Sequence, residues 1–181
     1  DTEYRYKVRY SQDGDAKGFK KRGSTEVVNI DSCPLVSKQT ISDCITVGGK
    51  TFHLSPSVFF QNNLEIAKKI ADFILENIVG NVVYDFYAGV GFFSAFIEDK
   101  YIVTAVEGNP ECKKYAHQNL KLAHYIESGI EDVHKYLKKK ADTIIVDPPR
   151  SGMSKKAIKN LLSYKSERVI YISCSYINAI R

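Results

Sequence analysis

The sequence lacks any apolar run long enough to cross a membrane. Hydrophobic residues make up 44% of the 181-residue chain, which is enough to form a core. No stretch approaches the ~20 consecutive apolar residues of a membrane-spanning helix, and no signal-peptide pattern follows Asp1. We therefore expect a cytoplasmic protein that makes no contact with a membrane. The missing initial Met suggests a piece of a longer protein.

Metal-binding patterns are also absent from the sequence. The 4 cysteines form no Cys-x-x-Cys pair, and the 4 histidines have no zinc spacing. The sequence therefore predicts no metal site. Scattered cysteines in a chain without a secretion signal are typical of reduced thiols in a cytosol-like compartment.

The excess of basic over acidic residues is moderate, with a formal net charge of +5 at pH 7. The basic residues gather in three groups, within residues 7–22, 138–140 and 155–159. This distribution permits a nucleic acid partner without proving one. Each group alone could equally be a solvated face of the protein.

Short alternating patterns near the beginning of the chain are typical of β-strands. Residues 4–10 alternate tyrosine and valine with arginine and lysine, which predicts a half-buried strand followed by a turn over residues 11–15. Residues 16–21 and 25–30 predict two further strands. We predict that residues 1–45 form a small antiparallel β segment with a cationic face, too small for an independent core.

Strands and helices alternate in residues 46–181, which indicates a mainly parallel, doubly wound α/β sheet. A hairpin is predicted over residues 46–53, and a helix over residues 63–78, ending at Gly80. Buried strands are predicted over residues 82–86, 101–106, 125–127, 143–146 and 169–172, and further helices after residue 91 and over residues 110–122, 131–137 and 154–162.

Polar residues and glycines recur where the predicted strands end. Tyr87, Gly89 and Gly91 form a small-residue turn after the first buried strand, Glu107 follows the second, and Asp147 follows the fourth. In an open α/β sheet the carboxyl ends of the strands form the edge where ligands bind. The turn alone could be a tight corner, but the whole set predicts a ligand site at this edge.

Three of these positions have suitable chemistry. The carboxylate of Glu107 can accept hydrogen bonds from the two hydroxyls of a ribose. Asp147-Pro148-Pro149-Arg150 forms a rigid corner that cannot continue a sheet and would hold Asp147 in one place. Cys174 follows the last predicted strand and could be either an inert thiol or a nucleophile. A nucleophile would need a nearby cation, for which Arg150 is a candidate.

The ordered motifs resemble those of the S-adenosylmethionine-dependent RNA uracil-5-methyltransferases. The motifs are Phe59-Phe60-Gln61-Asn62-Asn63, Asp85-Phe86-Tyr87-Ala88-Gly89-Val90-Gly91, Val106-Glu107-Gly108-Asn109, Asp147-Pro148-Pro149-Arg150-Ser151-Gly152-Met153 and Ser173-Cys174. Residues 18–35 also resemble the small β domain of that family. The resemblance covers nearly the whole chain and implies a Rossmann-like class I methyltransferase domain over residues 46–181.

The resemblance implies a role for each matching residue. Gln61, Tyr87, Glu107 and Asp147 match positions that hold S-adenosylmethionine, next to the turn at Gly89 and Gly91. Cys174 matches the nucleophile, which adds to carbon 6 of uracil so that carbon 5 can accept the methyl group. Asp147 and Arg150 would assist there. The implied substrate is a uridine in tRNA or rRNA, and we expect a monomer.

The chain departs from the family pattern at several positions. Phe92 stands where the family often has asparagine, and Ser175-Tyr176 follows Cys174 in place of Asn-Pro. The final strands of the family's sheet and its general-base glutamate would lie beyond Arg181. We therefore expect weak or moderate cofactor binding and poor turnover from this chain alone.

Two alternatives stay open from the sequence. A methyltransferase acting on the amino group of a base often has an aromatic residue after Asp-Pro-Pro, whereas this chain has Arg150. A degenerate copy could instead bind RNA or cofactor without catalysis.

Overall fold

The structure is a computed structural model that describes Arg5, residues 11–31, Cys33, Leu35, residues 43–137 and residues 140–174. Its internal contacts divide the chain into two units. The first comprises Asp1–Ser42 with Gln61–Ala67, and the second comprises Asp43–Phe60 with Lys68–Arg181. The functional division into a β domain (residues 1–45) and a catalytic domain (residues 46–181) stays a prediction.

The first unit contains a three-stranded antiparallel sheet of β1 (Ser11–Asp13), β2 (Ala16–Lys20) and β3 (Val27–Asn29). The predicted turn over residues 11–15 is wrong in part, because residues 11–13 pair with β2 and leave only Gly14 and Asp15 as the turn. The strand expected over residues 4–10 lies outside the described residues apart from Arg5. Arg5 forms an antiparallel bridge with Asn63.

The second unit is built on a five-stranded parallel sheet, which confirms the predicted α/β class. The strands are β6 (Val82–Phe86), β7 (Ile102–Glu107), β8 (His124–Glu127), β9 (Thr143–Val146) and β10 (Arg168–Tyr171), in the order β10-β9-β6-β7-β8. The order runs outward in both directions from β6, so β6 is the central strand. The turn after β6 therefore lies in the middle of the edge where ligands bind.

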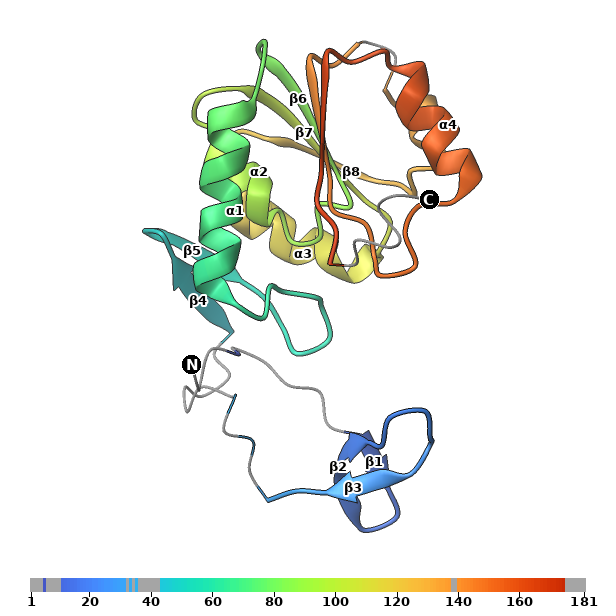
Figure 1. Ribbon diagram of the computed structural model, residues 1–181. Helices are drawn as coiled ribbons and strands as arrows, with labels where there is room; N and C mark the ends of the chain where they lie inside the picture. Colours follow the sequence, from blue (N-terminus) through green and yellow to red (C-terminus); the bar gives the residue numbers. More distant parts are fainter. Residues whose placement is uncertain are drawn as a thin grey trace. The chain divides into compact units, whose positions relative to one another are not determined.

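Helices cover both faces of this sheet. They are α1 (Leu64–Asn77), α2 (Phe92–Ile97), α3 (Pro110–Asn119) and α4 (Lys155–Ser163). Figure 1 shows α2 and α3 on one face of the sheet and α4 on the other. Because side chains alternate along a strand, Tyr84 and Phe86 pack toward α4 while Asp85 reaches α2. No helix among the described residues has the length and apolar character needed to cross a bilayer.

The helix predicted over residues 131–137 is largely absent, because only one 3₁₀ turn, η1 (Val133–Lys135), forms there. The side-chain amide of Asn160 on α4 donates to the carbonyl oxygens of Ile130 (2.9 Å) and Glu131 (2.7 Å). Those are the carbonyls that would begin an α-helix in this segment, so a long-range contact has replaced the local pattern.

A β-hairpin precedes the sheet in the second unit, as the sequence predicts. It consists of β4 (Cys44–Val47) and β5 (Lys50–His53), joined at Gly48 and Gly49. The ring of Phe52 on β5 lies in an aromatic cluster, with centroid distances of 5.7 Å to Phe60, 5.0 Å to Phe92 and 5.9 Å to Phe96. The hairpin therefore packs on the helix that follows the central strand.

Candidate active site at the carboxyl edge of the sheet

The turn between β6 and α2 has an unusual backbone. Tyr87, Gly89 and Gly91 have positive φ angles of 63°, 56° and 86°. Glycine adopts this conformation readily, whereas the tyrosine bears a strain of about 1–2 kcal/mol. The Ala88 N–H donates to the carbonyl oxygen of Val106 (3.1 Å), which ties the turn to the end of β7.

The two glycines of the turn have different surroundings. A Cβ atom on Gly91 would lie 2.8 Å from the side chain of Leu120, whereas a Cβ on Gly89 would meet no atom of the described residues within 4 Å. Gly91 is therefore needed for packing against the chain after α3. Gly89 borders open space, where a ligand could approach the backbone closely.

Glu107 is held in place at the end of β7. Its Oε2 accepts a hydrogen bond from the Gly89 N–H (2.9 Å), and its Oε1 accepts one from the Asn109 N–H (2.7 Å). A carboxylate offers about four lone pairs, so each oxygen can still accept one more donor. The half-buried carboxylate is thus oriented beside the open space at Gly89 and can accept the two hydroxyls of a ribose.

Asp85, on the central strand, has a structural role that the sequence reasoning missed. It is fully buried, and its Oδ2 accepts hydrogen bonds from the Ser94 N–H (3.1 Å) and hydroxyl (2.6 Å). Its Oδ1 has no hydrogen-bond partner in the part of the chain that the structure describes. Burial raises the pKa of Asp85 to about 7, the negative charges of Asp147 and Glu107 add to the rise, and the Ser94 hydrogen bonds oppose it. An acid directly before a glycine turn was the available signal.

Asp147 lies at the same edge, directly after β9. Its N–H donates to the carbonyl oxygen of Phe86 at the end of β6 (3.3 Å), and its side chain is half-buried. The Gly152 N–H donates to the Pro149 carbonyl (2.8 Å), which gives the following loop a local turn. Arg150 is exposed on this loop.

Cys174 follows the neighbouring strand and is exposed. The Ile172 N–H donates to the carbonyl oxygen of Val146 (2.8 Å), so the chain leaving β10 runs beside the chain that leads into Asp147. The structure thus brings Glu107, Asp147 and Cys174 to one edge of the sheet. An interaction of Arg150 with Cys174 stays a prediction. So does the role of Gln61, which groups by its contacts with the first unit.

Tyr87 is half-buried in the same region. Burial raises the pKa of its phenol to about 12, and the charges of Glu131, Tyr171 and Glu107 add to the rise in that order. The phenol is therefore neutral at physiological pH. These three neighbours come from the segment that follows β8, from the end of β10 and from the end of β7.

Asn119 is a second residue whose role the sequence reasoning missed. It is buried at the end of α3, where its side-chain amide donates to the carbonyl oxygens of Val90 (2.9 Å) and His53 (3.0 Å). Its Oδ1 accepts the His53 N–H (2.6 Å). One side chain therefore joins β5 to the glycine turn. A polar residue among the apolar positions of α3 was the available signal.

Phe92 occupies the position where the family resemblance leads to asparagine. The ring is buried and stands edge-on to Phe60, with a centroid distance of 5.4 Å and an interplanar angle of 88°. The side chain belongs to the aromatic cluster beneath the turn. Packing thus accounts for phenylalanine at this position.

Comparison with known sequences supports a methyltransferase. Residues 49–172 match the sequence profile of the TRM5/TYW2 methyltransferase domain. The chain belongs to this family. The expected RNA methyltransferase family is thereby confirmed at a broader level than the uracil-5 enzymes that the motifs resemble.

Curated relatives of this TRM5/TYW2-family chain are named as RNA methyltransferases. A Lactobacillus johnsonii protein called an uncharacterized RNA methyltransferase is 37% identical over 139 residues, which cover 70% of this chain and 30% of that protein. A Mycoplasma mobile protein of the same description is 34% identical over 170 residues, or 88% of this chain and 46% of that protein. The chain therefore spans less than half the length of these relatives.

Solved structures confirm the Rossmann-like methyltransferase fold. The tRNA (uracil-54, C5)-methyltransferase of Pyrococcus abyssi, in complex with S-adenosylhomocysteine, aligns with a TM-score of 0.78 at 18% identity, over 96% of this chain and 67% of that chain. The tRNA m1G37 methyltransferase of M. jannaschii aligns with a TM-score of 0.51 at 20% identity, over 73% of this chain and 41% of that chain.

The cofactor of this TRM5/TYW2-family domain is S-adenosylmethionine, and the residues at the sheet edge fit it. Gly89 leaves open space beside the Glu107 carboxylate, which suits a ribose. The charges of Asp147 and Glu107, which both act on Asp85, give the region a negative potential that suits a sulfonium cation. No cluster of histidine, cysteine or carboxylate side chains suited to a metal ion occurs in the described parts of the chain.

Proposed function

We propose that this chain is the cofactor-binding, nucleophile-bearing part of an enzyme that methylates carbon 5 of a uridine in tRNA or rRNA. The observation that carries the proposal is the exposed Cys174, three residues after the end of β10, beside the strand whose end leads into Asp147. A thiol there lies at the same edge of the sheet as the turn that would receive the methyl donor. The motif set around Asp147 and Cys174 supports the same substrate.

The chemistry requires a nucleophile because carbon 5 of uracil is itself poorly nucleophilic. The Cys174 thiolate adds to carbon 6, and the electron pair of the 5,6 double bond moves toward the carbonyl at carbon 4 as an enolate. Carbon 5 of this enolate then forms the new bond to the methyl group, which S-adenosylmethionine supplies from its sulfonium. A base removes the proton from carbon 5, and the thiolate leaves from carbon 6 as the double bond re-forms.

RNA as the partner agrees with the distribution of charge. Lys17, Lys20, Lys21 and Arg22 are exposed on and beside β2. A group of exposed cationic side chains of this kind suits a phosphate backbone. The target uridine would have to leave its stack to reach the thiol, as in other enzymes that act on a base.

A trapping experiment tests the proposal. In RNA with 5-fluorouridine, fluorine replaces the proton that must leave carbon 5, so the covalent adduct persists. With S-adenosylmethionine present, we expect a protein–RNA adduct on a denaturing gel that Cys174→Ser abolishes. The matched control Cys44→Ser changes another exposed thiol and should keep the adduct. An adduct that survives in Cys174→Ser would contradict the assignment of the nucleophile.

Methylation of nitrogen 1 of guanine is the second candidate. Two observations favour it. Residues 49–172 match the TRM5/TYW2 profile, and one protein with a similar fold is named a tRNA m1G37 methyltransferase. This reaction needs only a base for the ring N–H, for which Asp147 is available, and no covalent adduct. Mass spectrometry of nucleosides from treated RNA separates 5-methyluridine from 1-methylguanosine. Under this second candidate Cys174→Ser would retain activity, and cofactor binding without either product would favour a non-catalytic module.

A further inference from the structure

The segment after β8, residues 128–132, contacts the strand end that carries Glu107. We call this segment the β8–η1 loop. The Ser128 N–H donates to the carbonyl oxygen of Glu107 (2.9 Å). A Cβ on Gly108 would lie only 3.4 Å from the Cα of Gly129, so the two loops run closely together. The beginning of the β8–η1 loop is therefore fixed to the cofactor side of the site.

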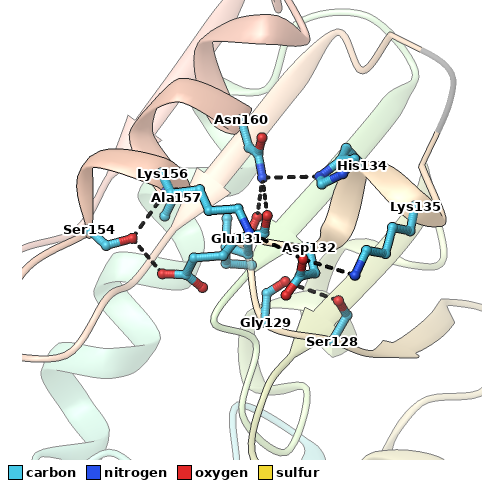
Figure 2. Close-up of polar contacts among 11 residues, drawn as sticks. Ser128, Gly129, Glu131, Asp132, His134, Lys135, Ser154, Lys156, Ala157 and Asn160 are labelled. Atoms are coloured by element: carbon cyan, nitrogen blue, oxygen red, sulfur yellow. Dashed lines mark hydrogen bonds and ion pairs between the residues drawn. The ribbon is translucent and has the colours of Figure 1, made fainter.

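The end of the same loop is fixed to α4 (Figure 2). The Ser154 hydroxyl donates to Oε1 of Glu131 (2.5 Å). The Asn160 amide donates to the Glu131 carbonyl oxygen (2.7 Å), and Lys156 pairs with Asp132 (3.3 Å). The three contacts are made by Ser154, Lys156 and Asn160, which lie at the beginning of α4 and in its first two turns. Together they hold the loop in one orientation.

Ser154 also terminates a loop that begins in the candidate site. This β9–α4 loop, residues 147–154, starts at Asp147 and includes Arg150. The Ser154 Oγ accepts the Ala157 N–H (3.1 Å) as the N-cap of α4, and the hydroxyl proton is donated to Glu131. The Glu131 carboxylate therefore secures the far end of the loop whose near end is Asp147. Its charge also acts on Tyr87 in the glycine turn.

We propose that Glu131 is a positioning residue, which holds the β9–α4 loop against the cofactor-binding edge through its hydrogen bond to Ser154. The contact links two segments that each hold part of the site, Glu107 on one side and Asp147 on the other. The inference rests on the proposed function only in taking this edge as the cofactor site. It concerns loop geometry and does not depend on which base is methylated.

Hydrogen exchange and calorimetry on the full chain test this role. Glu131→Ala removes the carboxylate that accepts the hydrogen bond from the Ser154 hydroxyl. Ser154→Asp keeps an N-cap for α4 but has no hydroxyl proton to donate, and its negative charge repels that of Glu131. We expect each to speed amide exchange in residues 150–153 and to weaken S-adenosylhomocysteine binding, both by about three- to ten-fold. The double variant should be no worse than either single one, because one contact is lost in each case.

The controls separate positioning from general loss of structure. Ser154→Thr keeps the hydroxyl and should behave like the unmodified chain. Lys156→Ala removes the neighbouring pair with Asp132 and should leave exchange in residues 150–153 unchanged. Unchanged exchange and binding in Glu131→Ala, or strictly additive effects in the double variant, would overturn the proposal. None of these measurements uses RNA, so they stand apart from the 5-fluorouridine result.

Discussion

At the scale of single residues, Asp85 combines complete burial with one carboxylate oxygen that has no hydrogen-bond partner among the described residues. Its pKa is raised from 3.8 to about 7 in the folded chain. The folded state therefore binds the proton more tightly than the unfolded state does. Between these two pKa values the free energy of unfolding should fall as the pH rises, because deprotonation is favoured more in the unfolded chain.

The Asp85→Asn substitution tests this pH dependence. Asparagine keeps the shape of the side chain but cannot ionise. The free energy of unfolding of the variant should therefore lack the part of the fall with pH that Asp85 causes. Between pH 5 and pH 8 we expect the unmodified chain to lose about 2 kcal/mol relative to the variant. Urea unfolding at several pH values measures the difference, and parallel profiles for the two proteins would contradict the assignment.

The position of Gly89, Glu107 and Asp147 at the edge of the sheet could be predicted, whereas the contacts that support this edge could not. Each of the three lies at or soon after the end of a strand, and periodicity alone predicts where buried strands end. The roles of Asp85 and Asn119 depend on partners such as Ser94 and His53, which are brought close only by folding. Sequence spacing carries no information about such tertiary hydrogen bonds.

At the scale of elements, the turn between β6 and α2 offers a matched pair of substitutions. Alanine at either Gly89 or Gly91 would cost about 1–2 kcal/mol, because both have positive φ. At Gly91 the new methyl group would also clash with Leu120, which adds about 1–3 kcal/mol. At Gly89 the methyl group would enter the open space instead.

We therefore expect different consequences from the two variants. Gly91→Ala should lower the free energy of unfolding more than Gly89→Ala does. Gly89→Ala should keep the fold but weaken S-adenosylhomocysteine binding by at least about ten-fold, because the new methyl group would overlap the bound ligand. Urea unfolding and calorimetry measure both properties. Equal stability losses, or normal binding by Gly89→Ala, would argue against this distinction.

The elements that were wrongly predicted have a physical explanation in common. The helix expected over residues 131–137 shrinks to η1 because Asn160 takes the carbonyls that would begin it. Residues 11–13 form a strand because β2 supplies a partner for them. In both cases a contact made by the folded chain outweighs a weak local preference.

At the scale of the whole molecule, the net charge of +5 agrees with the proposed RNA partner, and contacts between basic side chains and phosphates would make that binding sensitive to salt. A first double variant, Lys20→Ala with Arg22→Ala, removes two exposed positive charges from the β segment. A second double variant, Lys100→Ala with Lys114→Ala, removes two exposed positive charges from the second unit and serves as the control. We expect the first pair to reduce RNA affinity and to lower the slope of log affinity against log salt by about 1–2. The second pair should have little effect.

Fluorescence anisotropy with a labelled tRNA at several salt concentrations measures these slopes. Binding of S-adenosylhomocysteine should be the same in both double variants, because neither touches the edge that carries Glu107. Equal losses of RNA affinity in the two variants would contradict an RNA-contacting role for the β segment. A monomeric state and a cytoplasmic location remain predictions at this scale.

The division of the chain into units was only partly visible in the sequence. The strand pattern and the family resemblance predict a functional boundary after residue 45, whereas the contacts divide the chain after Ser42, and the functional boundary stays a prediction. The return of Gln61–Ala67 to the first unit could not be predicted. It depends on long-range contacts such as the bridge between Arg5 and Asn63.

The Asn119 contacts have a spectroscopic consequence. The His53 amide proton is donated over only 2.6 Å to Asn119, whose own amide group holds the Val90 carbonyl in the glycine turn. A proton in so short a hydrogen bond should resonate far downfield and exchange slowly with solvent. Its chemical shift would therefore follow the state of the turn, so an NMR titration could detect a ligand at Gly89 through a nucleus that the ligand never touches.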